Sequence, residues 1–144
     1  HPHLCCELLD LQLEACREAG IRAPIYLSAG FDDLMAAEHP EWRVVDIHGV
    51  SGAKPLRAGF KASMRWNSSY LDYLCAQIEE VVTRWPDADG IFLDIIVAWE
   101  DFSPDSLAAM DAACLDPSNP ADVREFAYRN LLEYYRRTNA AAWI

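Results

Sequence analysis

The alternation of apolar and polar residues divides the chain into helical and extended segments. Over residues 4–19, apolar side chains recur at every third or fourth position, which predicts an amphipathic helix that ends at Gly20. Residues 23–29 form a short apolar run with the length of a buried strand. Residues 90–97 form a second such run, which is apolar at both alternations except at Asp94. We therefore expect two buried strands, each preceded by a helix.

Further helices are predicted between and after the strands. Residues 31–64 lack a sustained period, which predicts a long excursion with one helical turn near Leu34. Capping residues, apolar periodicity and proline stops then indicate helices over 67–85, 103–113 and from 121 to the C-terminus. The last of these helices is expected to bury Phe126, Leu131, Leu132 and Tyr135. The order helix, strand, helix, strand, helix is typical of parallel βα units.

The predicted fold class is α/β. Two strands are too few for an independent sheet, so we expect a partial (β/α)8 TIM barrel, roughly half of one, that forms a single domain over residues 1–144 of a longer chain. Strands joined through a helix normally lie side by side with a right-handed crossover, so residues 23–29 and 90–95 should pair in parallel. The unpaired strand edges of a half barrel would favour homo-oligomers.

Composition excludes several classes of partner. The chain carries 23 Asp and Glu against 12 Lys and Arg, and its net charge of −11 repels the phosphates of nucleic acid. No run approaches the roughly 18 to 20 apolar residues of a membrane span. The five cysteines lack a C-x-x-C spacing, which favours reduced thiols in a cytoplasmic protein. His1-x-His3 is too short a motif for a metal site, so we predict neither a metal nor a cofactor.

Asp94 is the first candidate for chemistry. An ionised carboxylate within an apolar strand is costly unless it is paired or lies at the exposed end of the strand. Asp94 lies near the end of its run, and the C-terminal ends of strands open onto the active site in βα proteins. The alternative is a structural carboxylate that caps the following loop or pairs with a buried arginine.

Several segments resemble, in the same order, the hypothetical glycosyl hydrolase 6 family: 1–4 (HPHL), 20–30 (GIRAPIYLSAG), 39–43 (HPEWR), 67–74 (NSSYLDYL) and 89–94 (DGIFLD). The family is similar to the alpha-L-fucosidase and beta-galactosidase-like barrels. The resemblance therefore implies a TIM barrel, a carbohydrate substrate and retaining hydrolysis. It also implies that Asp94 matches the carboxylate ending the fourth barrel strand, which is the nucleophile position in the fucosidase relatives.

Retaining hydrolysis needs a second carboxylate that acts as acid and base, about 5 to 5.5 Å from the nucleophile. Glu100 and Asp101 follow Asp94 in the same loop and are reachable candidates. Carboxylates in such a position are more commonly solvated loop charges. In the related barrels the acid/base comes from a later strand, which this chain does not contain, so we also expect that group to lie outside residues 1–144.

Four residues of the described motifs, and His1 before them, are candidates for binding the sugar. Tyr26 and Ser28 alternate along the first strand and would present hydroxyl groups, unless they pack the barrel interior. His39 and Trp42 offer an imidazole and an aromatic face, although Trp42 would equally serve to fasten the long loop to the barrel. His1 opens a helix whose N-terminus should face the catalytic side.

Three hypotheses follow for the function. The first is a glycosidase with Asp94 as nucleophile, which a second carboxylate near Asp94 would favour. The second is a barrel that binds carbohydrate without catalysis, which a cleft lined by Trp42 and Tyr26 would favour. The third is a structural fragment, which burial of Asp94 against an arginine would favour.

Overall fold

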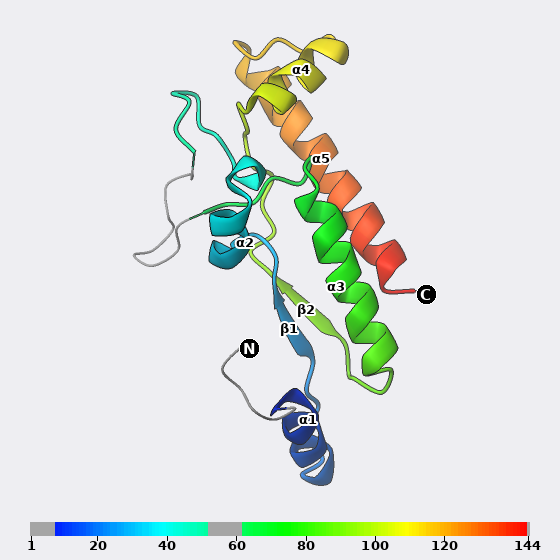
Figure 1. The fold of residues 1–144 in the computed structure, drawn as a ribbon. Coiled ribbons are helices and arrows are strands. Elements are labelled where there is room, and N and C mark those ends of the chain that lie inside the picture. Colours follow the sequence, from blue (N-terminus) through cyan, green and yellow to red (C-terminus); the bar gives the residue numbers. More distant parts are fainter. Residues whose placement is uncertain (1–7, 52–61, 144) are drawn as a thin grey trace.

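The computed structural model describes residues 8–51 and 62–143, and it contains the elements in the expected order (Figure 1). They are α1 (Leu8–Glu18), β1 (Ile25–Ser28), α2 (Asp33–Glu38), the 3-10 turn η1 (Pro40–Trp42), α3 (Tyr70–Arg84), β2 (Ile91–Asp94), α4 (Pro104–Ala112) and α5 (Pro120–Ala141). Among the described residues, no helix combines the length and the apolar character of a membrane span.

The two strands pair in parallel, which confirms the predicted pairing. Ile25 lies opposite Ile91, and Ser28 lies opposite Asp94, so both strands end at the same level. The sheet has two strands within residues 8–51 and 62–143, and a barrel beyond them stays a prediction. The second strand is shorter than expected because Ile95 adopts a left-handed backbone, with φ of 59°, which ends the extended run at Asp94.

One face of this sheet is covered and the other is open. Ile25 is buried, and Leu27, Ile91 and Leu93 pack against the core cluster that α3 supplies. On the opposite face, Tyr26 and Phe92 are 57% and 54% exposed, with their rings stacked at 5.9 Å. The apolar pattern at both alternations of residues 90–97 predicted burial on both sides, whereas the described residues cover a single side.

The core is formed mainly by α3, along which α5 runs (Figure 1). Tyr70, Leu74 and Ile78 of α3 are fully buried. On α5 the buried aromatic residues are Phe126, as expected, and Tyr134, whose ring lies 4.5 Å from that of Trp66. Leu132 and Tyr135, which were expected to be buried, are exposed.

Leucine and tyrosine recur too often along α5 for sequence spacing to select the contact face. Several overlapping stripes satisfy the same period of 3.6 residues. The apolar positions that α5 buries are Val123, Phe126, Ala127, Tyr134 and Ala141. Phe126 is buried and Leu131 packs against the core cluster, so the expected face is wrong at Leu132 and Tyr135.

The open face leads to a prediction about the isolated 144-residue chain. We expect it to associate as its concentration rises, because Tyr26 and Phe92 are exposed beside unpaired strand edges. Phe92→Lys should weaken association about tenfold, since roughly 1.5 kcal/mol of apolar burial is lost at the contact. Sedimentation velocity over a concentration series measures this. Tyr128→Lys is the control, because Tyr128 is 58% exposed but lies on α5. A monomer at every concentration would contradict the prediction.

Candidate active site

The site is built where β1 and β2 end. Both strands run toward the side of the molecule that holds α2 (Figure 1). Asp94 is the last residue of β2, and its side chain lies on the same open face as Tyr26 and Ser28, because alternate residues of a strand share a face. The Tyr26 hydroxyl donates a hydrogen bond to Asp94 Oδ2 at 2.8 Å. The two strands thus bring together residues 68 positions apart in the sequence.

This contact changes the chemistry of Tyr26. Its hydrogen bond to the Asp94 carboxylate raises the pKa of Tyr26 above the usual value for a tyrosine. Loss of the phenolic proton would break the bond and set two negative charges side by side. Tyr26 therefore remains a neutral donor at physiological pH and holds the carboxylate in one orientation.

Asp94 is not part of a structural ion pair within the described residues. The ion pairs of residues 8–51 and 62–143 involve other carboxylates. A half-buried carboxylate on an open face, held by a neutral donor, fits a site residue better than a core ion pair. The arginine-paired arrangement that would favour a structural role is absent there.

The main-chain turn after Asp94 is held against the end of β1. The Gly30 N–H donates to the Asp94 carbonyl oxygen at 3.1 Å, and the Met64 N–H donates to the Gly30 carbonyl oxygen at 3.1 Å. A β-carbon added to Gly30 would lie 1.8 Å from the carbonyl oxygen of Ile95, so no side chain fits at this position. In the sequence, Gly30 only follows the apolar run of the first strand, and nothing marks Ile95.

Ser28 is near Asp94 in register but is engaged elsewhere. Its hydroxyl donates to the carbonyl oxygen of Phe31 and closes the turn that follows β1. Binding of a sugar by Ser28 stays a prediction, and it would require this local bond to be shared with the ligand.

His39 and Trp42 lie side by side. Their rings stack at 3.8 Å with an angle of 13° between the planes, and Nδ1 of His39 lies 3.0 Å from a carboxylate oxygen of Glu41. Trp42 also contacts the rings of Tyr70 and Tyr73 on α3. With one indole face covered by the imidazole, the arrangement favours Trp42 as a fastener of the loop. Sugar binding by this pair remains a prediction that this geometry does not test.

The two carboxylates after the strand have different surroundings. Glu100 is exposed, whereas Asp101 is 3% exposed and accepts hydrogen bonds from the hydroxyls of Ser103 and Ser106 and from the Val45 N–H. Asp101 thus ties the long loop to the start of α4, with the buried Arg65 guanidinium 3.7 Å away. Asp101 therefore has a structural role, whereas Glu100 is the carboxylate of this loop that is open to solvent. His1 lies outside the described residues.

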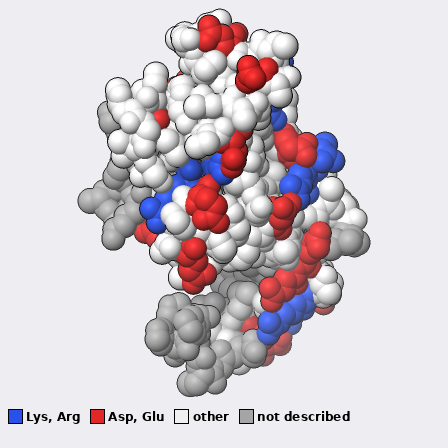
Figure 2. Space-filling view, turned by 45° about the horizontal axis from the view of Figure 1, so that its top comes forward, with Lys and Arg blue, Asp and Glu red and all other residues white. Residues whose placement is uncertain are grey.

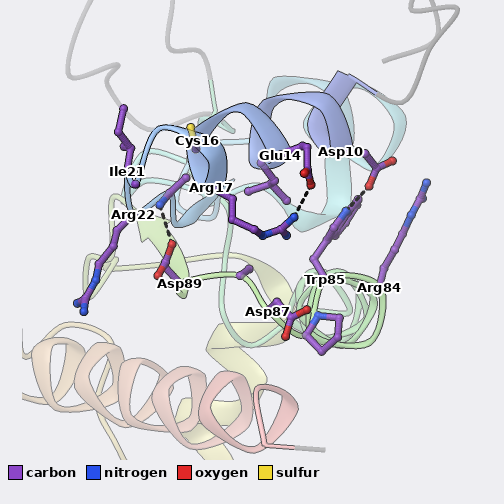
Figure 3. Close-up of a pocket in the computed structure, with 15 residues that line it drawn as sticks. Asp10, Glu14, Cys16, Arg17, Ile21, Arg22, Arg84, Trp85, Asp87 and Asp89 are labelled. Atoms are coloured by element: carbon purple, nitrogen blue, oxygen red, sulfur yellow. Dashed lines mark hydrogen bonds and ion pairs between the residues drawn. The ribbon is translucent and has the colours of Figure 1, made fainter.

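A pocket of about 430 Å³ lies at the other end of the sheet, between α1 and the turn after α3 (Figure 3). The Trp85 indole N–H donates to Asp10, and the Ala23 N–H donates to Asp89 at 2.9 Å across it. None of the predicted site residues lines this pocket. Its bonds fasten α1 to the body, and in βα barrels the N-terminal ends of strands serve stability.

The surface charges do not mark a second site. On the face shown in Figure 2, carboxylates and guanidinium groups are interspersed. Four of the exposed ion pairs in the described part of the chain, such as Arg129 with Glu125, join neighbours on one helix. Such exposed pairs stabilise a fold by less than about 1 kcal/mol each. Within the described residues, no group of three or more His, Cys, Asp or Glu side chains is placed to hold a metal ion.

Two comparisons with known proteins find relatives. Residues 1–95 match the family described as hypothetical glycosyl hydrolase 6. The structure matches alpha-L-fucosidase isoenzyme 2 from Paenibacillus thiaminolyticus with a TM-score of 0.88 and 36% sequence identity. The match covers 99% of this chain but 22% of the fucosidase chain, so the chain spans about a fifth of that relative. None of the curated proteins matches the chain.

The Tyr26–Asp94 contact leads to a titration prediction. In wild type the pKa of Tyr26 should lie above 10. Asp94→Asn should bring it down toward that value, because the hydrogen bond to a carboxylate and the neighbouring negative charge are both lost. Nuclear magnetic resonance of tyrosine labelled with ¹³C at Cζ, assigned with Tyr26→Phe, follows the phenol directly. Glu100→Gln removes a charge from the same loop and should leave this pKa unchanged. Equal Tyr26 pKa values in wild type and Asp94→Asn would show that the contact is absent in solution.

Proposed function

The chain belongs to the hypothetical glycosyl hydrolase 6 family, and on that premise we propose that it contributes the nucleophile, Asp94, to a retaining glycosidase. The bond between Tyr26 and Asp94 is the observation that carries the proposal. The bond supports the nucleophile role because the Asp94 carboxylate lies at the C-terminal end of a parallel strand, on the open face, and is oriented by a neutral donor.

The proposed chemistry follows from this arrangement. One oxygen of the Asp94 carboxylate accepts the Tyr26 hydrogen bond at 2.8 Å, which leaves the other oxygen to attack the anomeric carbon. The attack displaces the leaving group and forms a covalent glycosyl ester, which water then hydrolyses. The first configuration change is reversed by the second, so the product retains the configuration of the substrate.

The acid/base is proposed to lie in the part of the barrel outside this chain. It must protonate the leaving oxygen and later activate the water, at about 5 to 5.5 Å from Asp94. Glu100 remains the candidate within the chain, since it is exposed in the loop that follows β2. The length of the fucosidase relative supports an acid/base outside this chain. The match covers 22% of that relative, which leaves room for the further strands of a complete (β/α)8 barrel.

An L-fucoside is the proposed substrate class, since the matching structure carries the name alpha-L-fucosidase. The cytoplasm is the proposed compartment, supported by the free thiols of Cys16, Cys75 and Cys114. Both proposals concern the whole enzyme, to whose catalytic pair this chain would contribute Asp94.

Replacement of Asp94 tests the proposed role. In the complete barrel protein, Asp94→Asn should lower kcat for an activated aryl α-L-fucoside by at least about a thousandfold, because the attacking oxygen is lost. Azide should restore part of the activity by attacking from the vacated side, which yields a fucosyl azide of inverted configuration and the free aryl oxide. Product configuration by nuclear magnetic resonance and turnover by aryl oxide absorbance are the measurements.

Two variants serve as controls for this experiment. Glu100→Gln should keep turnover if the acid/base lies on another strand, and should lose it if Glu100 is that group. Circular dichroism of Asp94→Asn should match wild type, because Asp94 is half-buried on the open face. Near-wild-type turnover by a folded Asp94→Asn variant would refute the nucleophile assignment. Sugar binding by wild type without turnover would instead identify a carbohydrate-binding barrel.

A further inference from the structure

The turn after Asp94 is strained at one residue. Ile95 has φ of 59°, a left-handed conformation that is unfavourable for a β-branched residue because its side chain crowds the backbone. Cys114 is the other described non-glycine residue with positive φ, and it follows the end of α4, where left-handed residues are common. Ile95 follows a strand, so helix termination does not explain its conformation. Strain of this kind persists where the surrounding structure enforces it.

The backbone of Gly30 lies directly against this turn. It is buried, and its N–H and carbonyl group bond to Asp94 and Met64. The φ of Gly30 lies outside the left-handed range, so its conformation does not require glycine. Glycine is required because the Ile95 peptide lies so close. An added β-carbon would be 2.8 Å from the Ile95 carbonyl carbon and 1.8 Å from its oxygen.

We propose that Gly30 and Ile95 form a backbone clamp that positions the Asp94 carboxylate. The clamp holds the main chain on both sides of the Asp94 carbonyl group, while Tyr26 holds the end of the side chain. Gly30 and Ile95 are thus positioning residues, and their effect on catalysis rests on the proposed function. Movement of a reacting group by about 1 Å commonly lowers rates by about a hundredfold.

The clamp is tested first by titration of Tyr26 in the complete barrel protein, without any assay of activity. Gly30→Ala must push the Ile95 peptide away and carry Asp94 with it, so the pKa of Tyr26 should fall toward 10 as in Asp94→Asn. Gly49→Ala is the matched control, because Gly49 has φ of 77° and open space around its β-position. This control strains the backbone without touching the site and should leave the Tyr26 pKa unchanged.

A second variant covers the case in which Gly30→Ala does not fold. Ile95→Gly deletes only a side chain and frees the backbone to leave the left-handed region. In the complete barrel protein, it should lower kcat about tenfold or more with little change in KM, since the substrate still binds but meets a less ordered carboxylate. Gly49→Ala should keep the wild-type kcat.

The outcomes separate the clamp from the proposed function. A wild-type Tyr26 pKa in a folded Gly30→Ala variant would overturn the clamp. Wild-type kcat in Ile95→Gly would also overturn it, provided that Asp94→Asn has lost its turnover. Equal changes in Gly49→Ala and Gly30→Ala would also overturn it, because the effect would then be general destabilisation. If Asp94→Asn keeps its turnover, the nucleophile assignment fails, while the Tyr26 titration still decides whether Gly30 positions Asp94.

Discussion

The burial of one sheet face under α3 fixes the position of every side chain at the candidate site. Ile25, Leu27, Ile91 and Leu93 turn toward the core cluster, and the alternation of side chains then sends Tyr26, Ser28, Phe92 and Asp94 to the opposite face. A slip of one residue in β2 would turn Phe92 and Asp94 toward the core and bury the Asp94 carboxylate there. The large cost of burying an unpaired charge therefore reinforces the register that apolar packing selects.

Tyr70 connects the start of α3 to the ends of the strands. This residue is fully buried, and its hydroxyl donates to the Ala29 carbonyl oxygen at 2.9 Å, directly before Gly30. Burial raises the pKa of the Tyr70 hydroxyl far above its usual value, so the donor stays protonated. The start of α3, the end of β1 and the turn after β2 are thus connected by neutral hydrogen bonds, and Arg65 with Asp101 holds the loops outside them.

Much of the fold could be predicted from the sequence because apolar runs and helix stops are local signals. The two strands, their parallel pairing and the helices between them follow from such patterns. Asp94 could be singled out because a lone charge in an apolar strand is costly. Its bond to Tyr26 could not, since it depends on a register set by distant packing. The burial of Asp101 beside the exposed Glu100, and the backbone of Ile95, likewise arise only once the loops meet.

The parallel pairing of the strands has a consequence for the order of folding. The bond from Ala23 to Asp89 at the start of the sheet closes a loop of 66 residues, and a loop of that length forms slowly because its closure costs chain entropy. The contact between α3 and α5 is also long-range, but each helix gains its own backbone bonds before docking. Strand pairing gains little until α3 offers a surface to cover. The site at the strand ends should accordingly be among the last parts of the chain to assemble during synthesis.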